Sequence, residues 1–191
     1  MSLRGLILKA RSCRRFHENE RIPRQLLVEW VDLGRHCPSA GNVQPLKYFL
    51  SVEPETNAAI FPMLRWTGGL AEGQGPAEGE RPAAYVAILL DKNISAKIDC
   101  DHGIVAHAIL LGAVEAGFAG CMIGAIDREG LRVALNLPGH LEIALVVALG
   151  RPNETIVIDA VGPDGDTGYY RDARGVRHVP KRSLEDIIVK P

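Results

Sequence analysis

The apolar stretch IVAHAILLGAVEAGFAGCMIGAI, residues 104 to 126, constrains the fold more than any other feature of this sequence. It is long enough to be tested as a membrane span. However, it contains His107 and Glu115, and four glycines interrupt it. A charged side chain in mid-span is costly, and closely spaced glycines favour a break in the helix. We therefore expect a buried helix, a turn and a buried strand, and no membrane span.

The rest of the 191-residue chain alternates between amphipathic and apolar segments. Helices are expected over residues 2–10, 22–37, 101–118 and 127–138, and buried strands over residues 46–52, 83–91, 120–126 and 143–150. Asp101 is expected to cap the third of these helices. The segments do not follow a regular βαβαβ alternation, which favours an α+β fold over a doubly wound sheet.

Two segments differ from this apolar framework. Residues 67–82 are rich in Gly, Glu and Pro, and we expect a mobile surface loop or lid there. The tail, residues 151–191, is too polar to fold alone, and packing on a partner subunit is one way for it to become ordered. Near its end, Ser183 and Asp186 have the spacing of a helix-capping pair. We treat residues 1–191 as a single domain.

Charge and cysteine content exclude several classes of protein. The net charge of −1 gives no overall attraction to nucleic acid or to an anionic membrane. The four cysteines form no CxxC pair, so we expect free thiols and no metal site. His102 and His107 lie about 140° apart around a helix, which argues against a shared metal ion. The start of the chain shows no cleavage site of a secretory signal, and we expect a cytoplasmic protein.

Nucleotide-binding loops do not fit the sequence. The stretch GQGPAEG departs from GxGxxG by one residue and precedes a strand instead of following one. There is also no GxxxxGK[ST] loop. Neither a Rossmann fold nor a P-loop is expected.

Basic residues gather at two distant places. Arg11, Arg14 and Arg15 stand beside Ser12 in RSCRRF, and Lys181 and Arg182 lie near the end of the chain. Guanidinium groups give bidentate hydrogen bonds to phosphate, and a serine hydroxyl adds a further donor. From the residues alone, a phosphate site and a solvated basic turn remain equally good interpretations.

Four stretches together resemble the nitroreductase-like FMN flavoprotein family. RSCRRF resembles its N-terminal arginine–serine motif, and PSAGNVQP its Pro-Ser-x-x-Asn-x-Gln-Pro loop. GAVEAGFAGCMIGAI resembles its Gly-Cys-x-Ile-Gly segment, and VPKRSLEDII the C-terminal basic motif of one branch. The four stretches occur in the family's order and span residues 11 to 188.

The resemblance implies an α+β fold with a central mixed, mostly antiparallel sheet flanked by helices, in an intertwined homodimer that binds FMN at its interface. The resemblance also implies which residues of this sequence would bind the cofactor. The FMN phosphate would be held near Arg11, Ser12, Cys13, Arg14, Arg15, Lys181 and Arg182, and the flavin ring near Ile123, Gly124 and the other subunit's Pro38, Ser39, Asn42 and Gln44. His107, where the family often carries glutamine, is expected to make a buried polar contact in the core.

The function implied is an FMN-dependent oxidoreductase. NAD(P)H would reduce the flavin and leave, and a nitro compound, quinone or related acceptor would then take the electrons. The flavin carries the chemistry, so no catalytic side chain is assigned. Two alternatives are a flavin-binding or storage protein, or a family member with other flavin chemistry, and an interaction dimer with a vestigial pocket.

Overall fold

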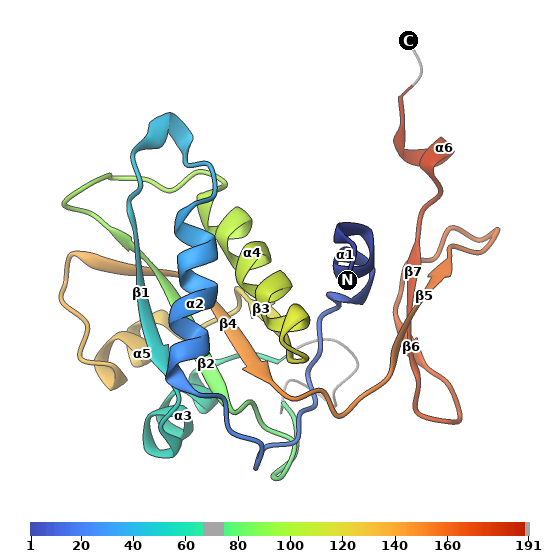
Figure 1. Ribbon diagram of the computed structural model, residues 1–191, viewed down its shortest axis with the longest axis horizontal. Helices are drawn as coiled ribbons and strands as arrows, with labels where there is room; N and C mark the ends of the chain where they lie inside the picture. Colours follow the sequence, from blue (N-terminus) through green and yellow to red (C-terminus); the bar gives the residue numbers. More distant parts are fainter. Residues whose placement is uncertain (67–74, 190–191) are drawn as a thin grey trace.

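The computed structural model describes residues 1–66 and 75–189 (Figure 1). Its centre is a four-stranded sheet of β1 (Leu46–Ser51), β2 (Ala84–Asp91), β4 (Leu141–Gly150) and β3 (Ala119–Ile123), in the order β1-β2-β4-β3. Every neighbouring pair in this sheet is antiparallel. The prediction of an α+β fold with a mostly antiparallel sheet is thereby confirmed.

Helices cover both faces of this sheet. On one face lie α2 (Arg24–Arg35) and α4 (Asp101–Glu115), and on the other α3 (Pro54–Ile60) with the 3-10 turn η2 (Phe61–Met63) and α5 (Arg128–Ala134) (Figure 1). The α3 helix was not predicted, because its short sequence PETNAAI has little apolar periodicity.

The central strand β2 explains how both faces form a core. All its residues are buried, and their alternation sends Val86 and Ile88 toward α2 and α4. Tyr85 and Leu89 point to the opposite face, toward α3 and α5. The apolar run 83–91, predicted as a central strand, therefore forms the central strand β2.

The apolar stretch 104–126 forms a helix, a turn and a strand, as predicted. The α4 helix ends at Glu115, earlier than residue 118, because Gly117 adopts φ +82° and reverses the chain. The N–H of Phe118 then donates to the carbonyl of Ala113 at 2.8 Å. No helix in the described ranges is both long and apolar enough to cross a membrane.

The segment after the first helix and the C-terminal tail lie together beside this core. In Figure 1, α1 (Leu3–Lys9) is seen between α4 and the tail. The tail folds into a second sheet, order β5-β7-β6, from β5 (Ile156–Ala160), β6 (Tyr170–Arg171) and β7 (Arg177–Lys181). It ends in α6 (Leu184–Ile187), where Ser183 and Asp186 form the predicted capping box.

The tail thus has local structure of its own, which its polar sequence did not indicate. It still exposes large apolar side chains, among them Leu184, Ile187 and Ile188. Its packing on a partner subunit stays a prediction, as does the single-domain reading of residues 1–191. Of the predicted mobile loop 67–82, residues 67–74 lie outside the described residues.

Candidate functional site

The segment after α1 runs in extended form along the free edge of β3. Ser12 forms a parallel bridge with Gly120, and the N–H of Cys13 donates to the Gly120 carbonyl at 3.0 Å. A Cβ at position 120 would lie 2.3 Å from the carbonyl oxygen of Ala148 on β4. Glycine is therefore needed at this position for β3 to pack this closely on β4. Cys13 is buried in the protein, while its neighbours Ser12 and Arg14 line a cavity.

That cavity, here called the basic cavity, has a volume of about 280 Å³ and is lined by four parts of the chain. Its lining comprises Ala10, Arg11, Ser12 and Arg14 from the N-terminal segment, His107 and Leu110 from α4, Met122 from β3, and Tyr169, Arg177, Val179 and Lys181 from the tail. Within the described part of the chain, its lining contains no carboxylate.

Two guanidinium groups of the basic cavity carry buried N–H donors without an acceptor. Nε of Arg11 and Nη1 of Arg177 are both buried and form no hydrogen bond with any residue that the structure describes. Arg177 is only 2% exposed, and its burial, together with the nearby charge of Arg14, lowers its pKa from the ordinary arginine value. Buried polar groups normally have a partner, so these donors fit an anionic ligand such as a phosphate.

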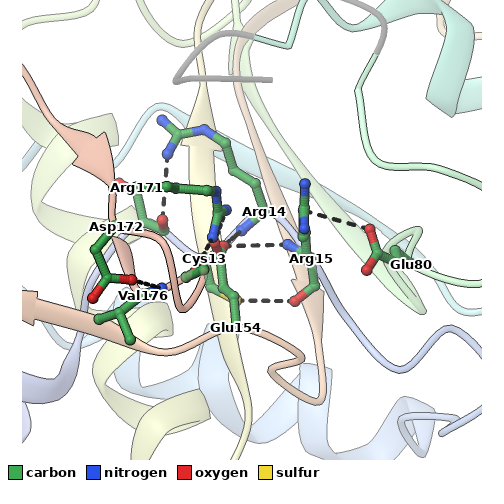
Figure 2. A network of polar contacts seen from close by, with 10 residues as sticks. Cys13, Arg14, Arg15, Glu80, Glu154, Arg171, Asp172 and Val176 are labelled. Carbon is green, nitrogen blue, oxygen red and sulfur yellow. Dashed lines mark hydrogen bonds and ion pairs between the residues drawn. The ribbon is translucent and has the colours of Figure 1, made fainter. Parts of the chain in front are cut away.

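A buried carboxylate joins the two chain ends behind the basic cavity. Figure 2 shows Glu154 at the centre of a network that includes Arg14, Arg15 and Arg171. Its Oε1 accepts the main-chain N–H of Arg14 at 2.5 Å and that of Arg15 at 3.3 Å, and its Oε2 pairs with the Arg171 guanidinium. Burial by itself would raise the pKa of Glu154, but the Arg14 N–H and the Arg171 charge bring the pKa below the ordinary value.

The predicted phosphate-binding residues divide into two groups. Arg11, Ser12, Arg14 and Lys181 come together around the basic cavity. The other three do not line it. Arg15 pairs instead with Glu80, and its Nε lies 3.5 Å from Oε2 of that residue. Arg182 is exposed, and Cys13 is buried. The Cys13 thiol donates to the Arg15 carbonyl at 3.2 Å, and burial raises its pKa, so this cysteine has a packing role here.

The predicted loop PSAGNVQP lies at the N-terminal end of α4. Pro38, Ser39 and Gln44 line a separate cavity of about 140 Å³, which shares no lining residue with the basic cavity. The Ser39 hydroxyl donates to Oδ2 of Asp101 at 2.5 Å and accepts the N–H of Gln44 at 2.9 Å. Asp101 was expected to cap α4, but Cys100 occupies that position and the buried Asp101 carboxylate holds the loop instead.

The backbone of this loop is strained at two non-glycine residues. Asn42, at the end of the 3-10 turn η1 (Ala40–Asn42), has φ +55°, and Gln44 has φ +53°. Such conformations cost on the order of 1 kcal/mol each and concentrate at functional sites. Both side chains are exposed, and Gln44 Nε2 donates to Asn42 Oδ1 at 3.1 Å. The loop therefore presents two amide side chains outward from a fixed backbone.

The other predicted flavin contact, Ile123 and Gly124, contains one buried residue and one with open space beside it. The Ile123 side chain is buried in the core between the sheet, α3 and α5. The described residues provide no hydrogen-bond acceptor for the N–H of Gly124. A Cβ there would meet only Leu145 Cδ1 at 3.8 Å, so the space beside this peptide is open. Met122, two residues earlier, lines the basic cavity.

Several residues of the basic cavity were missed from the sequence. His107 was expected in the core but lines the basic cavity. Arg177, whose guanidinium lies 4.5 Å from the Tyr169 ring, was not predicted, and neither was Glu154, which lies outside the cavity. A signal for Arg177 exists, because Arg177, Val179 and Lys181 share one face of a strand. Glu154 has no such signal. Among the described residues, no cluster of His, Cys, Asp or Glu could hold a metal ion.

Comparison with known proteins gives a family match. The nitroreductase family matches residues 7–67 and 83–151 of this chain. The match includes Arg11 to Arg15, the loop 38–45 and Gly124, and it ends before the tail that carries Arg177 and Lys181.

Solved structures share the fold. A nitroreductase family protein from Clostridium difficile 630 is 21% identical with a TM-score of 0.63, over 81% of this chain and 86% of that one. An FMN-dependent nitroreductase from Clostridium difficile R20291 is 20% identical with a TM-score of 0.63, over 80% and 88%. An Exiguobacterium sibiricum protein named as a nitroreductase, solved in complex with FMN, is 15% identical with a TM-score of 0.66, over 81% and 90%.

Proposed function

The chain belongs to the nitroreductase family, and from this premise we propose that it is an FMN-dependent oxidoreductase that uses NAD(P)H to reduce nitro compounds, quinones or related acceptors. The observation that carries the proposal is the basic cavity, in which Arg11 and Arg177 hold buried N–H donors without an acceptor. A phosphate group would satisfy both donors and neutralise the surrounding cations.

In this proposal the phosphate of FMN occupies the basic cavity. Arg11, Arg14, Arg177 and Lys181 supply positive charge, and the Ser12 hydroxyl supplies a further donor. The Gly124 N–H lies at an open position near Met122 and would donate to the flavin ring. Bound FMN would supply the hydride-transfer chemistry, while the protein positions and tunes it.

The remaining predicted contacts belong to a second subunit. Pro38, Ser39, Asn42 and Gln44 line or flank a different cavity within one chain, so they would reach the ring from the partner in a homodimer. The strained, hydrogen-bonded loop fits such a role, because its outward amides are fixed before any ligand arrives. The exposed apolar residues of the tail, Leu184, Ile187 and Ile188, would pack on the same partner.

Flavin binding is tested with a pair of arginine variants on one hairpin. The purified protein should be yellow and release FMN on denaturation. Arg177→Met should weaken FMN binding by about tenfold or more, because a hydrogen bond to a charged group contributes roughly 1.5–3 kcal/mol. Arg174→Met is the control, since that side chain is 83% exposed and pairs with the neighbouring Asp172 outside the basic cavity. A colourless protein whose absorbance does not respond to added FMN contradicts the proposal.

Reductase activity is tested separately from flavin binding. Under anaerobic conditions NADH or NADPH should bleach the bound flavin, and an added quinone or nitro compound should restore its colour. In steady state, double-reciprocal plots at several acceptor concentrations should be parallel, as ping-pong kinetics require. A flavin that binds tightly but is bleached by neither nicotinamide supports a flavin-binding or storage protein instead.

A further inference from the structure

We infer that Glu154 is a positioning residue that holds the phosphate-binding arginines of the basic cavity in place from outside it. The inference rests on the proposed function, because the phosphate is that of FMN. Glu154 does not line the basic cavity, and its side chain is only 1% exposed. It therefore cannot be a direct ligand contact in this structure, and its effect must pass through the residues it binds.

The contacts of Glu154 join two segments that are far apart in sequence. One carboxylate oxygen accepts the main-chain N–H groups of Arg14 and Arg15, and the other pairs with Arg171 on β6. Arg171 is paired with Arg177 in the register of β6 and β7, and Arg177 carries one of the unpartnered donors. Glu154 thus connects both walls of the basic cavity through a single buried group.

The manner of binding leaves the ligand-facing groups available. Glu154 binds the main-chain N–H of Arg14, so the Arg14 guanidinium stays available. Among the described residues, this guanidinium donates only to the Ser12 carbonyl, at 3.3 Å. The guanidinium that pairs with the Glu154 carboxylate belongs to Arg171, which does not line the basic cavity.

Charge balance gives Glu154 a second effect on the same residues. The charges of Arg14 and Arg171 lower the pKa of buried Arg177, whereas the charge of Glu154 acts in the opposite direction. A carboxylate behind the basic cavity therefore offsets the repulsion among these cations without placing a negative charge on the lining.

The experiment compares Glu154→Gln with Glu80→Gln and measures the affinities for FMN and for riboflavin, which lacks the phosphate. Glutamine preserves the size of the side chain but places an amide donor where Arg171 needs an acceptor. Removing one partner of a buried pair leaves the other charge uncompensated. Glu80 pairs with Arg15 at the surface, so its replacement tests the loss of an ion pair from the same network.

We expect Glu154→Gln to reduce FMN affinity by about tenfold or more while riboflavin affinity changes by less than about twofold. Glu80→Gln should leave both affinities within about twofold of the wild type. A general loss of structure would lower both affinities together, so the FMN-to-riboflavin ratio distinguishes positioning from mere destabilisation. Equal losses for the two ligands, or an unchanged ratio, overturn the inference.

A second variant covers the case in which Glu154→Gln does not fold. Arg171→Met removes the other partner of the same ion pair, whose side chain is more exposed than that of Glu154. This variant should also lower the ratio of FMN affinity to riboflavin affinity. A folded Arg171→Met protein with the full preference for FMN overturns the inference and leaves the proposed function standing. A wild-type protein that binds FMN no better than riboflavin overturns the proposed function, and the inference with it.

Discussion

The two sheets of this protein are stabilised by different forces. The four-stranded sheet is covered on both faces, and its central strand β2 is buried throughout. The tail sheet has one buried residue along its strands, Arg177, and is held by polar contacts such as the ion pair of Arg171 with Glu154 and the hydrogen bond between His178 and Asp159 at 2.6 Å. The basic cavity lies between them, with one wall on each.

This difference has consequences for the site. Apolar burial is non-directional and depends little on protonation, so the wall formed by β3 and α4 should be robust. Charged hydrogen bonds need a particular geometry and a particular protonation state. The wall that carries Arg177 and Lys181 should therefore respond to conditions that leave the main sheet intact.

The largest expected contrast comes from one substitution in each sheet. Ile88 on β2 is 0% exposed, and Ile88→Ala should lower the free energy of unfolding by about 2–5 kcal/mol. Ile158 on β5 is 37% exposed, and Ile158→Ala should cost less than about 1 kcal/mol. Chemical denaturation measures both values. Similar losses at the two positions would show that the tail sheet contributes to the same core.

Acid should release the tail before the main sheet unfolds. The pKa of Glu154 is lowered in the folded protein, so its contribution is complete above the ordinary glutamate pKa of about 4.3 and is lost as the pH falls through the lowered value. Protonation weakens hydrogen bonds that contribute roughly 1.5–3 kcal/mol each.

Hydrogen exchange followed from about pH 6 down to about pH 2, corrected for intrinsic rates, measures this release. Amides of β7 should lose protection while those of β2 keep theirs. Simultaneous loss in both strands would contradict separate stabilisation of the two sheets.

The smallest expected effect concerns the loop at the N-terminus of α4, which is held by a polar contact to a buried side chain. Ser39→Ala removes the hydroxyl that donates to buried Asp101 and should cost about 1 kcal/mol. Ser95→Ala is a matched control, because the Ser95 hydroxyl makes only exposed local contacts and its loss should stay within about 0.5 kcal/mol. Equal thermal shifts for the two variants would argue that the Ser39 contact does not hold the loop.

Much of the main sheet could be predicted, whereas the tail could not. Continuous apolar runs such as 83–91 are typical of a strand covered on both faces, and Gly117 marks the end of α4. The tail lacks such a pattern, so β5, β6 and β7 went unrecognised. Of the residues predicted to hold the phosphate, four line one cavity and three do not, namely Arg11, Ser12, Arg14 and Lys181 against Cys13, Arg15 and Arg182.

The sequence by itself determined the apolar sheet and the helices around it except α3, because local periodicity records which side of each element must be buried. It also determined that positive charge gathers at two places in a nearly neutral chain. Only the tertiary structure decided that these places meet, that Arg177 joins them and that Glu154 lies behind them. Contacts between residues about 140 positions apart depend on how the chain folds back, and no local pattern encodes that distance.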